Sequence, residues 1–360
     1  MTNYCFFNTV NAWGGGEKWH LEVVLYLHNK GQKVLLVAAP NSPLAQKAMA
    51  LGITVQTISL SNLSFLNPFV LFKIARLLKQ SKIDSLIMNS PRDLKCAGLA
   101  ARFIKVPKVI FRRGSDIAIK NNMLNRFLYQ SVIHKVLVNS PATEKSLNAN
   151  NKDLVAKSKI KLIPNGIDSS KFLASPVSPI YTKQADELVL CTLGRLVPQK
   201  NQGFLIDVAV ELKKRQFLFK LLIGGSGPLE NELKQISKAK GVADCIMFAG
   251  FVELPKDLYG SGDIFLLPSL WEGFGYVLAE AGLCALPSIA LNVSSNGQII
   301  QDGKTGILVS EPNPLLFADA VMMLSENEQL RHEMGAAAKS FVKKNFEAED
   351  IFKEIEHVIS

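Results

Sequence analysis

Two carboxylates, Glu272 and Glu280, lie eight positions apart in a glycine-rich stretch that follows a strand-like apolar run. Residues 274–284 have a helical pattern, and eight positions are about 2.2 helical turns. If Glu280 lies inside that helix, Glu272 therefore lies in the loop ahead of it. The backbone N–H groups of residues 273–275 could then bind hydroxyl groups, and a carboxylate could accept from both hydroxyls of a ribose. The spacing alone is explained equally well by an ordinary helix with acidic residues near its first turns, where the helix dipole stabilises them.

A second loop places two cations, Arg195 and Lys200, five residues apart just before the helix-like residues 201–215. A guanidinium binds phosphate oxygens as a fork and an ammonium binds them as a point charge, so together they could neutralise a diphosphate. Taken alone, the two side chains could equally be a solvated charge pair.

Two glycine-rich loops, residues 13–17 and 224–228, each follow an apolar strand and lead into a helix. Glycines let the backbone approach a ligand closely, and a helix N-terminus offers unpaired N–H groups to an anion. Neither loop has the spacing of a dinucleotide fingerprint or a Walker motif. Each could also be a flexible surface turn.

The elements that must position these loops form two series of short strands alternating with helices. The first half has strand-like runs at Tyr4–Phe7, Lys33–Ala38, Thr54–Ile58, Ser85–Asn89, Lys108–Arg112 and Lys135–Asn139. The second half has them at Leu188–Leu193, Phe219–Ile223, Ile246–Ala249, Ile264–Leu267 and Ser288–Leu291. This alternation predicts an α/β protein with two doubly wound parallel-sheet domains and a cleft between them. Ligands of such sheets bind beyond the carboxyl ends of the strands, where these loops lie.

Length and composition agree with two soluble globular domains. The chain has 360 residues, 48% of them hydrophobic and 20% charged, which is too long for one ordinary core. A proline-containing linker around 172–186 places the boundaries at 1–170, 171–340 and 341–360, the last segment being a helix that packs back toward the N-terminal domain. No apolar run is long enough to span a bilayer and no signal peptide is evident, so we expect a cytoplasmic protein. Five scattered cysteines and five histidines suggest no metal or disulfide site.

Charge is distributed unevenly along the chain. Residues 1–170 carry 23 Lys and Arg against 8 Asp and Glu, whereas the whole chain has 41 against 31. The first half is therefore strongly basic and the remainder mildly acidic. A basic domain attracts nucleic acid, anionic membranes or anionic substrates, and charge alone does not choose among them.

Taken together, these motifs resemble the retaining glycosyltransferases of family 4, which have two Rossmann-like domains in the GT-B architecture. The segment Glu272–Glu280 is similar to that family's EX7E signature, and Gly194-Arg195 with Lys200 resembles its diphosphate-binding pair. Further similar motifs are Gly14–Gly16, Gly224–Pro228, Pro164–Asp168 and Asp302–Gly306. The resemblance covers nearly the whole chain, with the motifs in family order.

The resemblance implies a role for each matching residue. Arg195 and Lys200 would hold the donor diphosphate and stabilise the charge that grows as it leaves, Glu272 would contact the transferred sugar, and Glu280 would bind the ribose. The remaining donor contacts would come from the backbone of Gly15, Gly16, Gly225, Gly273, Phe274 and Gly275. The resemblance implies no cofactor and no metal, and the sequence has no Asp-x-Asp motif.

Two departures from the family pattern concern the sugar pocket and the ribose or base contacts. Many members have a histidine near the position of residues 112–116, and none of the five histidines lies there. We expect Glu17, Arg113 and Asp116 to contribute to the acceptor or sugar pocket instead. Gln298 also stands where a glutamate is frequent, which weakens inferences about nearby ribose or base contacts.

The acceptor should belong to the basic N-terminal domain. Residues 68–79 and 120–135 combine many apolar side chains with a basic edge, which suits an anionic membrane surface, although the same residues could simply face the core. We expect a cell-surface glycan or lipid-linked acceptor, such as lipopolysaccharide core, O-antigen or capsular precursor, and a peripheral position on the inner face of the cytoplasmic membrane. Both UDP- and GDP-sugars suit the donor motifs, with UDP slightly favoured.

Three other functions remain open at this point. A nucleotide-sugar 2-epimerase of the same fold would bind the same donor and transfer nothing. An NAD-dependent oxidoreductase is disfavoured because neither opening strand is followed by a dinucleotide fingerprint. Nucleic-acid binding is disfavoured because the basic half has no aromatic-basic recognition signature.

Overall fold

The computed structural model describes residues 2–360 and divides the chain into two compact units. Unit 1 comprises the chain through Gly166 together with Glu349–Ser360, and unit 2 is Ile167–Ala348. Each unit is an all-parallel sheet covered by helices, so the predicted pair of doubly wound α/β domains is confirmed.

The sheet of unit 1 has seven strands in the order β3-β2-β1-β4-β5-β6-β7. They are β1 (Asn3–Asn8), β2 (Lys33–Ala38), β3 (Val55–Thr57), β4 (Ser85–Met88), β5 (Lys108–Arg113), β6 (Lys135–Val138) and β7 (Ile160–Leu162). In the central strand, Cys5 pairs with Leu35 of β2 on one side and with Leu86 of β4 on the other. The strand order therefore reverses at β1, and the loops after β1 and β4 flank the point where such sheets bind ligands.

Helices and short helical turns connect these strands. They are α1 (Gly15–Asn29), α2 (Pro43–Ala50), η1 (Ser64–Leu66), α3 (Pro68–Gln80), α4 (Pro91–Asp93), η2 (Leu94–Gly98), α5 (Leu99–Phe103), α6 (Met123–Phe127), η3 (Leu128–Val132), α7 (Pro141–Leu147), η4 (Lys157–Lys159) and α16 (Ala348–Ile359). Capping residues fix several starts: Ser42, Asn67 and Ser140 each accept a backbone N–H ahead of a helix that begins with proline.

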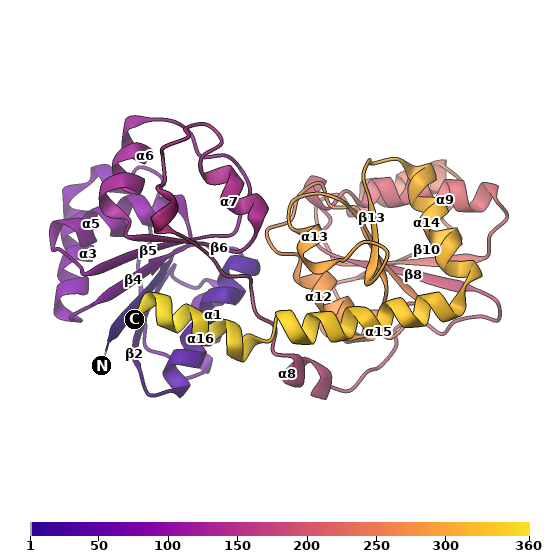
Figure 1. Ribbon diagram of the computed structural model, residues 1–360, viewed down its shortest axis with the longest axis horizontal. Coiled ribbons are helices and arrows are strands. Elements are labelled where there is room, and N and C mark those ends of the chain that lie inside the picture. The colour runs from indigo at the N-terminus through magenta and orange to yellow at the C-terminus, as the bar shows by residue number, and fades with distance from the viewer. Residues whose placement is uncertain (1) are drawn as a thin grey trace. The chain divides into compact units, whose positions relative to one another are not determined.

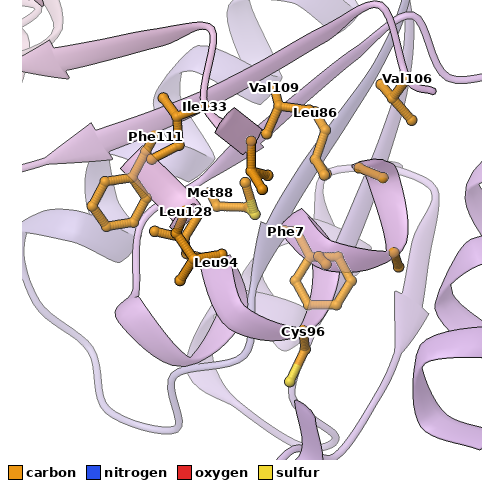
Figure 2. Packing of buried hydrophobic residues seen from close by; sticks show 14 of the residues in the cluster. Phe7, Leu86, Met88, Leu94, Cys96, Val106, Val109, Phe111, Leu128 and Ile133 are labelled. Atoms are coloured by element: carbon orange, nitrogen blue, oxygen red, sulfur yellow. The ribbon is translucent and has the colours of Figure 1, made fainter. Parts of the chain in front are cut away.

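One side of this sheet is closed by a single apolar core. Figure 2 shows Phe7 of β1, Met88 of β4 and Phe111 of β5 packed with Leu94 of η2 and Leu128 of η3. The side chains of all five are at most 2% exposed. Because burial of apolar surface is the main favourable term in folding, this core holds β4 and β5 against η2 and η3.

The sheet of unit 2 has six strands in the order β10-β9-β8-β11-β12-β13. They are β8 (Leu188–Leu193), β9 (Phe219–Gly224), β10 (Ile246–Gly250), β11 (Ile264–Leu267), β12 (Ser288–Leu291) and β13 (Gly306–Val309). Its helices are α8 (Ser169–Ala174), η5 (Pro198–Lys200), α9 (Gln202–Lys214), α10 (Glu230–Ala239), α11 (Pro255–Tyr259), α12 (Tyr276–Leu283), α13 (Asn296–Ile299), α14 (Pro314–Glu326) and α15 (Glu328–Asn345). The order reverses at β8, so the loops after β8 and β11 lie at the expected ligand-binding edge.

The domain limits differ from those expected at 170 and 340. The chain passes from unit 1 to unit 2 after Gly166. The predicted linker packs within unit 2, where Lys256 Nζ donates to Leu173 O at 2.9 Å. The chain returns from unit 2 to unit 1 after Ala348, because α15 runs on to Asn345 and its Val342 is buried against Gly282 of α12. Residues 341–348 therefore belong to unit 2.

Helix α16 completes unit 1 from the far end of the chain. It lies beside α1 (Figure 1), with the rings of Tyr26 and Phe352 5.5 Å apart. Lys30 Nζ and Glu356 Oε2 form an ion pair at 2.5 Å, and Lys161 pairs with Glu354 at 2.7 Å. Unit 1 is therefore built from two segments distant in sequence.

Candidate functional site

The loop after β8 presents the two predicted cations of unit 2. Lys200 ends the short turn η5, and its Nζ lies 2.5 Å from Glu272 Oε1. Arg195 is exposed and, within residues 2–360, forms no ion pair. Gln202 Nε2 donates to Arg195 O at 3.0 Å and so holds the backbone of the loop. One cation is therefore paired with the predicted sugar-binding carboxylate, and the other remains open to a ligand.

Glu272 lies in the loop between β11 and α12, held by two backbone hydrogen bonds and by its contact with Lys200. Its backbone carbonyl accepts from Ser295 Oγ at 3.2 Å, and the carbonyl of Trp271 accepts from Gln199 Nε2 at 2.9 Å. Gly275 then begins the helix with φ +80°, a left-handed conformation that favours glycine. The Glu272 carboxylate is consequently buried, with its side chain 8% exposed, and fixed beside Lys200.

The loops after β8 and β9 are packed backbone to backbone. Gly225 has φ +122°, and a Cβ at this position would lie 1.9 Å from Gly194 O. A Cβ on Gly227 would lie 2.4 Å from Leu196 O, and Leu196 N donates to Ser226 O at 3.0 Å. The glycines of this loop thus allow the cation-bearing loop to lie against it.

Glu280 lies within α12, and Glu272 lies in the preceding loop. The Glu280 side chain is buried, and its Oε2 accepts from Tyr259 Oη at 3.2 Å. Burial, followed by the charge of Glu280, raises the pKa of Tyr259 well above its usual value. Tyr259 therefore stays a neutral donor that orients the carboxylate.

In unit 1, helix α1 begins at the predicted glycine loop. Gly15 and Gly16 form its first residues, and a Cβ on Gly16 would lie 2.3 Å from Asn89 Nδ2 at the end of β4. Glu17 is buried in the first turn and accepts from Asn8 Nδ2 at 3.2 Å. The loops after β1 and β4 meet at Gly16, and a side chain there would displace the Asn89 amide.

Arg112 is the residue of this region that the sequence prediction left without a role. Its Nη1 donates to Asn89 Oδ1 at 3.1 Å and its Nη2 to Asn165 Oδ1 at 2.9 Å. The guanidinium also lies 5.2 Å from the centre of the Trp19 ring. Two adjacent arginines at the end of a buried strand were the signal, since a strand buried on both faces rarely carries charge.

His20 lies beside this cluster on α1, fully buried between aromatic rings. Its ring centre lies 5.6 Å from that of Phe6 and 5.3 Å from that of Trp19. Burial, together with the positive charge of Arg112, lowers the pKa of His20 to about 3. The imidazole is therefore neutral at physiological pH.

Arg113 and Asp116, the other residues predicted for the acceptor or sugar pocket, follow β5. Arg113 lines a cavity of about 540 Å³ within unit 1, whereas Asp116 is not among the lining residues. Arg113 Nη2 donates to Ile117 O, which folds the loop over the arginine. Glu17, on α1, does not line this cavity either. Of the three predicted residues, Arg113 alone lines this cavity.

Two family models match the chain in tandem. The model described as Glycosyltransferase Family 4 matches residues 13–171, and the model described as Glycosyl transferases group 1 matches residues 177–341. The first match lies almost entirely in unit 1 and the second within unit 2.

Similar proteins agree with these matches. The GDP-mannose-dependent alpha-(1-6)-phosphatidylinositol monomannoside mannosyltransferase of Mycobacterium tuberculosis is 31% identical over 51% of this chain and 51% of its own length. The chain spans only 36–51% of the first curated relatives it matches.

Solved structures match over nearly the full length. HepE from Anabaena in complex with UDP-glucose has a TM-score of 0.82 and 18% identity, over 99% of both chains. The lipopolysaccharide outer core galactosyltransferase WaaB has a TM-score of 0.79 and 18% identity, over 99% of both chains. At these identities the likeness shows the fold. With both family models matched in order and this fold throughout, the chain belongs to the GT-B glycosyltransferases of the family 4 type.

Proposed function

We propose that the chain transfers a hexose-type sugar from a nucleotide-diphosphate sugar to a cell-surface glycan or lipid-linked acceptor, with retention of the anomeric configuration and without a metal ion. The observation that carries the proposal is the contact between Lys200 and Glu272 at the carboxyl edge of the unit 2 sheet. It joins a cation suited to phosphate and a carboxylate suited to sugar hydroxyls, with the exposed Arg195 on the same loop.

The proposed donor site follows from charge. A departing nucleoside diphosphate gains negative charge, and fixed cations at that position lower the barrier. Arg195 and Lys200 supply two positive charges there, which is the task a divalent ion performs in metal-dependent transferases. Glu272 and the backbone of residues 273–275 would bind the sugar, and Glu280, oriented by Tyr259, would bind the ribose.

Relatives support both donor candidates. The mycobacterial mannosyltransferase is named for GDP-mannose, and HepE was solved with UDP-glucose. We favour a UDP-sugar slightly. Proposed acceptors of the lipopolysaccharide, O-antigen or capsule type are in line with the name of WaaB.

We also propose that unit 1 rests on an anionic membrane surface. Phe69 and Phe72 of α3 are 82% and 65% exposed, and Leu66 of η1 is 67% exposed. Lys73 and Arg76 also lie on α3. Exposed aromatic side chains beside cations suit an interface between lipid tails and anionic headgroups. None of the helices in residues 2–360 has the length and apolarity to cross a bilayer.

The donor proposal is tested by thermal denaturation with UDP, GDP, ADP and CDP, followed by sugar-transfer assays with the matching nucleotide sugars. The donor nucleotide should raise the melting temperature by mass action. Transfer should persist in EDTA, and NMR of the product should show the donor's anomeric configuration. Loss of activity in EDTA would overturn metal independence. Conversion of the sugar at C2 without any acceptor would instead identify a 2-epimerase.

The membrane proposal is tested by flotation with phosphatidylglycerol-containing vesicles. Replacing Phe69 and Phe72 by Ser should reduce binding at least several-fold, and high salt should reduce binding of the unaltered protein. Phe251→Ser is the matched control, because Phe251 is 78% exposed on unit 2. Equal binding by all three proteins would contradict the proposal.

A further inference from the structure

The cavity beside Arg113 lies wholly within unit 1, at the carboxyl ends of β4 and β5. Its volume is about 540 Å³. Pro91, Leu94 and Lys95 line it from the segment after β4, and residues 113–115 and 117–120 line it from the end of β5 and the loop that follows. These loops lie at the edge where parallel sheets bind ligands.

The charge of the lining has one sign. Its cationic residues are Lys95, Arg113 and Lys120, and no Asp or Glu is among the residues that line it. Lys95 Nζ also lies 5.3 Å from the centre of the Phe65 ring. The cavity is therefore an electropositive space.

Arg113 is the deepest of these cations and is incompletely paired. Its side chain is 9% exposed, and its Nε has no hydrogen-bond partner. Within the described residues it forms no ion pair, and its Nη2 donates to the backbone carbonyl of Ile117. A buried donor without a partner costs free energy, and a buried charge costs more. A ligand anion beside the guanidinium would offset part of that cost.

Tyr129 adds a second donor beside the arginine. Burial raises the pKa of Tyr129 to about 12, although the positive charge of Arg113 and its hydrogen bond act in the opposite direction. The phenol therefore keeps its proton at neutral pH and can donate to an anion. Tyr129 also lines the cavity.

The rest of the lining is apolar. Leu94, Phe111 and Leu128, which Figure 2 shows together in the core of unit 1, line one part of the cavity. Ile117 and Ile119 line another, and Ile117 is 64% exposed. A ligand that fits must carry an anion next to an uncharged or apolar portion.

We propose that this cavity binds the acceptor through a phosphate or carboxylate group held by Arg113 and Tyr129. The inference rests on the proposed transferase function and narrows it to anionic acceptors. Lys95 and Lys120 would attract the anion, and the apolar lining would contact the acceptor's uncharged portion. The anion could belong to a soluble sugar acid or sugar phosphate, or to a lipid headgroup with a phosphomonoester.

The test uses small probes that differ in charge. Glucose 6-phosphate and glucuronate, with glucose as the neutral control, are titrated against the full chain while the best-stabilising nucleotide saturates the donor site. Affinity is followed by thermal denaturation and calorimetry. In a parallel arm, flotation with phosphatidic acid vesicles measures binding to a lipid phosphomonoester.

Arg113→Gln should weaken anion binding at least tenfold, Arg113→Lys should weaken it less, and Lys120→Gln should weaken it a few-fold. Arg102→Gln is the matched control, because Arg102 is an exposed arginine of the same unit. It should leave anion binding unchanged. If Arg113→Gln fails to fold, the other two cationic lining residues, Lys95 and Lys120, replaced together by Gln, decide the question.

Arg113-dependent binding of the soluble probes identifies a soluble acceptor, and Arg113-dependent binding of the vesicles alone identifies a lipid headgroup. Equal anion affinity in Arg113→Gln and the unaltered protein overturns the proposal, as does absence of binding in both arms. Nucleotide stabilisation is measured in the same variants. Its absence, with Arg113-dependent anion binding retained, would refute the donor proposal while the anion site stands.

Discussion

The contact between Lys200 and Glu272 unites two residues that are 72 positions apart in sequence. The motifs identified both residues, but neither spacing predicted that they touch, because the contact depends on how two separate loops fold at one edge of a sheet. Lys200 has 16% of its side chain exposed and Glu272 has 8%. Water screens the attraction between these two charges less than at the surface, and removing one partner leaves the other charge buried and unpaired.

Lys200→Gln and Glu272→Gln should each reduce kcat by about 10²–10³ through lost stabilisation of the transition state. Lys234→Gln is the matched control, because Lys234 pairs with Glu230 at 2.6 Å on an exposed helix face. The control should change stability by less than about 0.5 kcal/mol and leave kcat unaltered. Steady-state assays with the identified donor give the comparison. Full activity in Lys200→Gln would show that Arg195 alone serves the diphosphate.

Gly225 lets the loop after β9 lie against the backbone of the loop after β8. Gly225→Ala should destabilise the protein by at least 2 kcal/mol more than Gly241→Ala, because its Cβ would lie 1.9 Å from Gly194 O. Gly241 also has a positive φ, +68°, but has nothing within 4 Å of a Cβ. The control therefore measures the conformational cost alone, about 1 kcal/mol. Urea denaturation of the two variants provides the difference, and equal losses would contradict the packing argument.

At the scale of elements, continuous apolar runs predicted the bounds of several strands. β2, β8, β11 and β12 begin and end where their apolar runs do. β13 was missed, because its four residues, Gly306–Val309, include a glycine and follow a glycine-rich turn. A Cβ on Gly306 would lie 2.4 Å from Ser288 O of β12, so that glycine is required by strand packing and not by a turn. Close backbone approach of this kind leaves no periodic signal in a sequence.

The sequence patterns predicted helices, but they did not predict the π-helical turns inside two of the helical segments. The helical segment after β4 contains the π-helical turn η2, and the one after β5 ends in the π-helical turn η3. Both turns supply lining residues of the Arg113 cavity, Leu94 from one and Leu128 from the other. π-Helical turns are frequent at functional sites, and tertiary packing decides them. The cavity therefore could not be predicted, although Arg113 itself was.

Helix α1 carries a buried histidine whose titration should govern part of the pH dependence of stability. The pKa of His20 is lowered from 6.5 to about 3 by burial and by Arg112. The unfolded chain therefore binds this proton first as pH falls, so the contribution is complete above pH 6.5 and is lost as the pH drops toward 3. Between pH 7 and pH 5 we expect a loss of about 2 kcal/mol from this residue.

His20→Gln should remove that part of the pH dependence, whatever its effect at pH 7. His357→Gln is the control, because His357 is exposed on α16. Urea denaturation at pH 7 and pH 5 gives the free energies of unfolding. If the difference between the two pH values were the same in His20→Gln as in the unaltered protein, another group would be responsible.

At the scale of the whole molecule, the chain returns to unit 1 after completing unit 2. The sequence predicted this return as a helix over 341–360 that packs toward the N-terminal domain, and the segment that joins unit 1 is Glu349–Ser360. The contacts of Tyr26 with Phe352 and of Lys30 with Glu356 assign α16 to unit 1. The charge contrast also follows the units, because the basic half of the sequence forms most of unit 1.

This connectivity predicts how the molecule should unfold when α16 is weakened. Phe352 is 7% exposed, so Phe352→Ala should cost unit 1 about 3 kcal/mol through lost burial and a cavity. The neighbouring Lys353 is exposed, and Lys353→Ala should cost less than about 0.5 kcal/mol. Calorimetry in the presence of the donor nucleotide separates the units, since the nucleotide stabilises only the unit that binds it. In Phe352→Ala the transition that the nucleotide raises should stay in place while the other moves to lower temperature. If the nucleotide-dependent transition moved equally, α16 would stabilise unit 2 as well, and the two units would unfold as one.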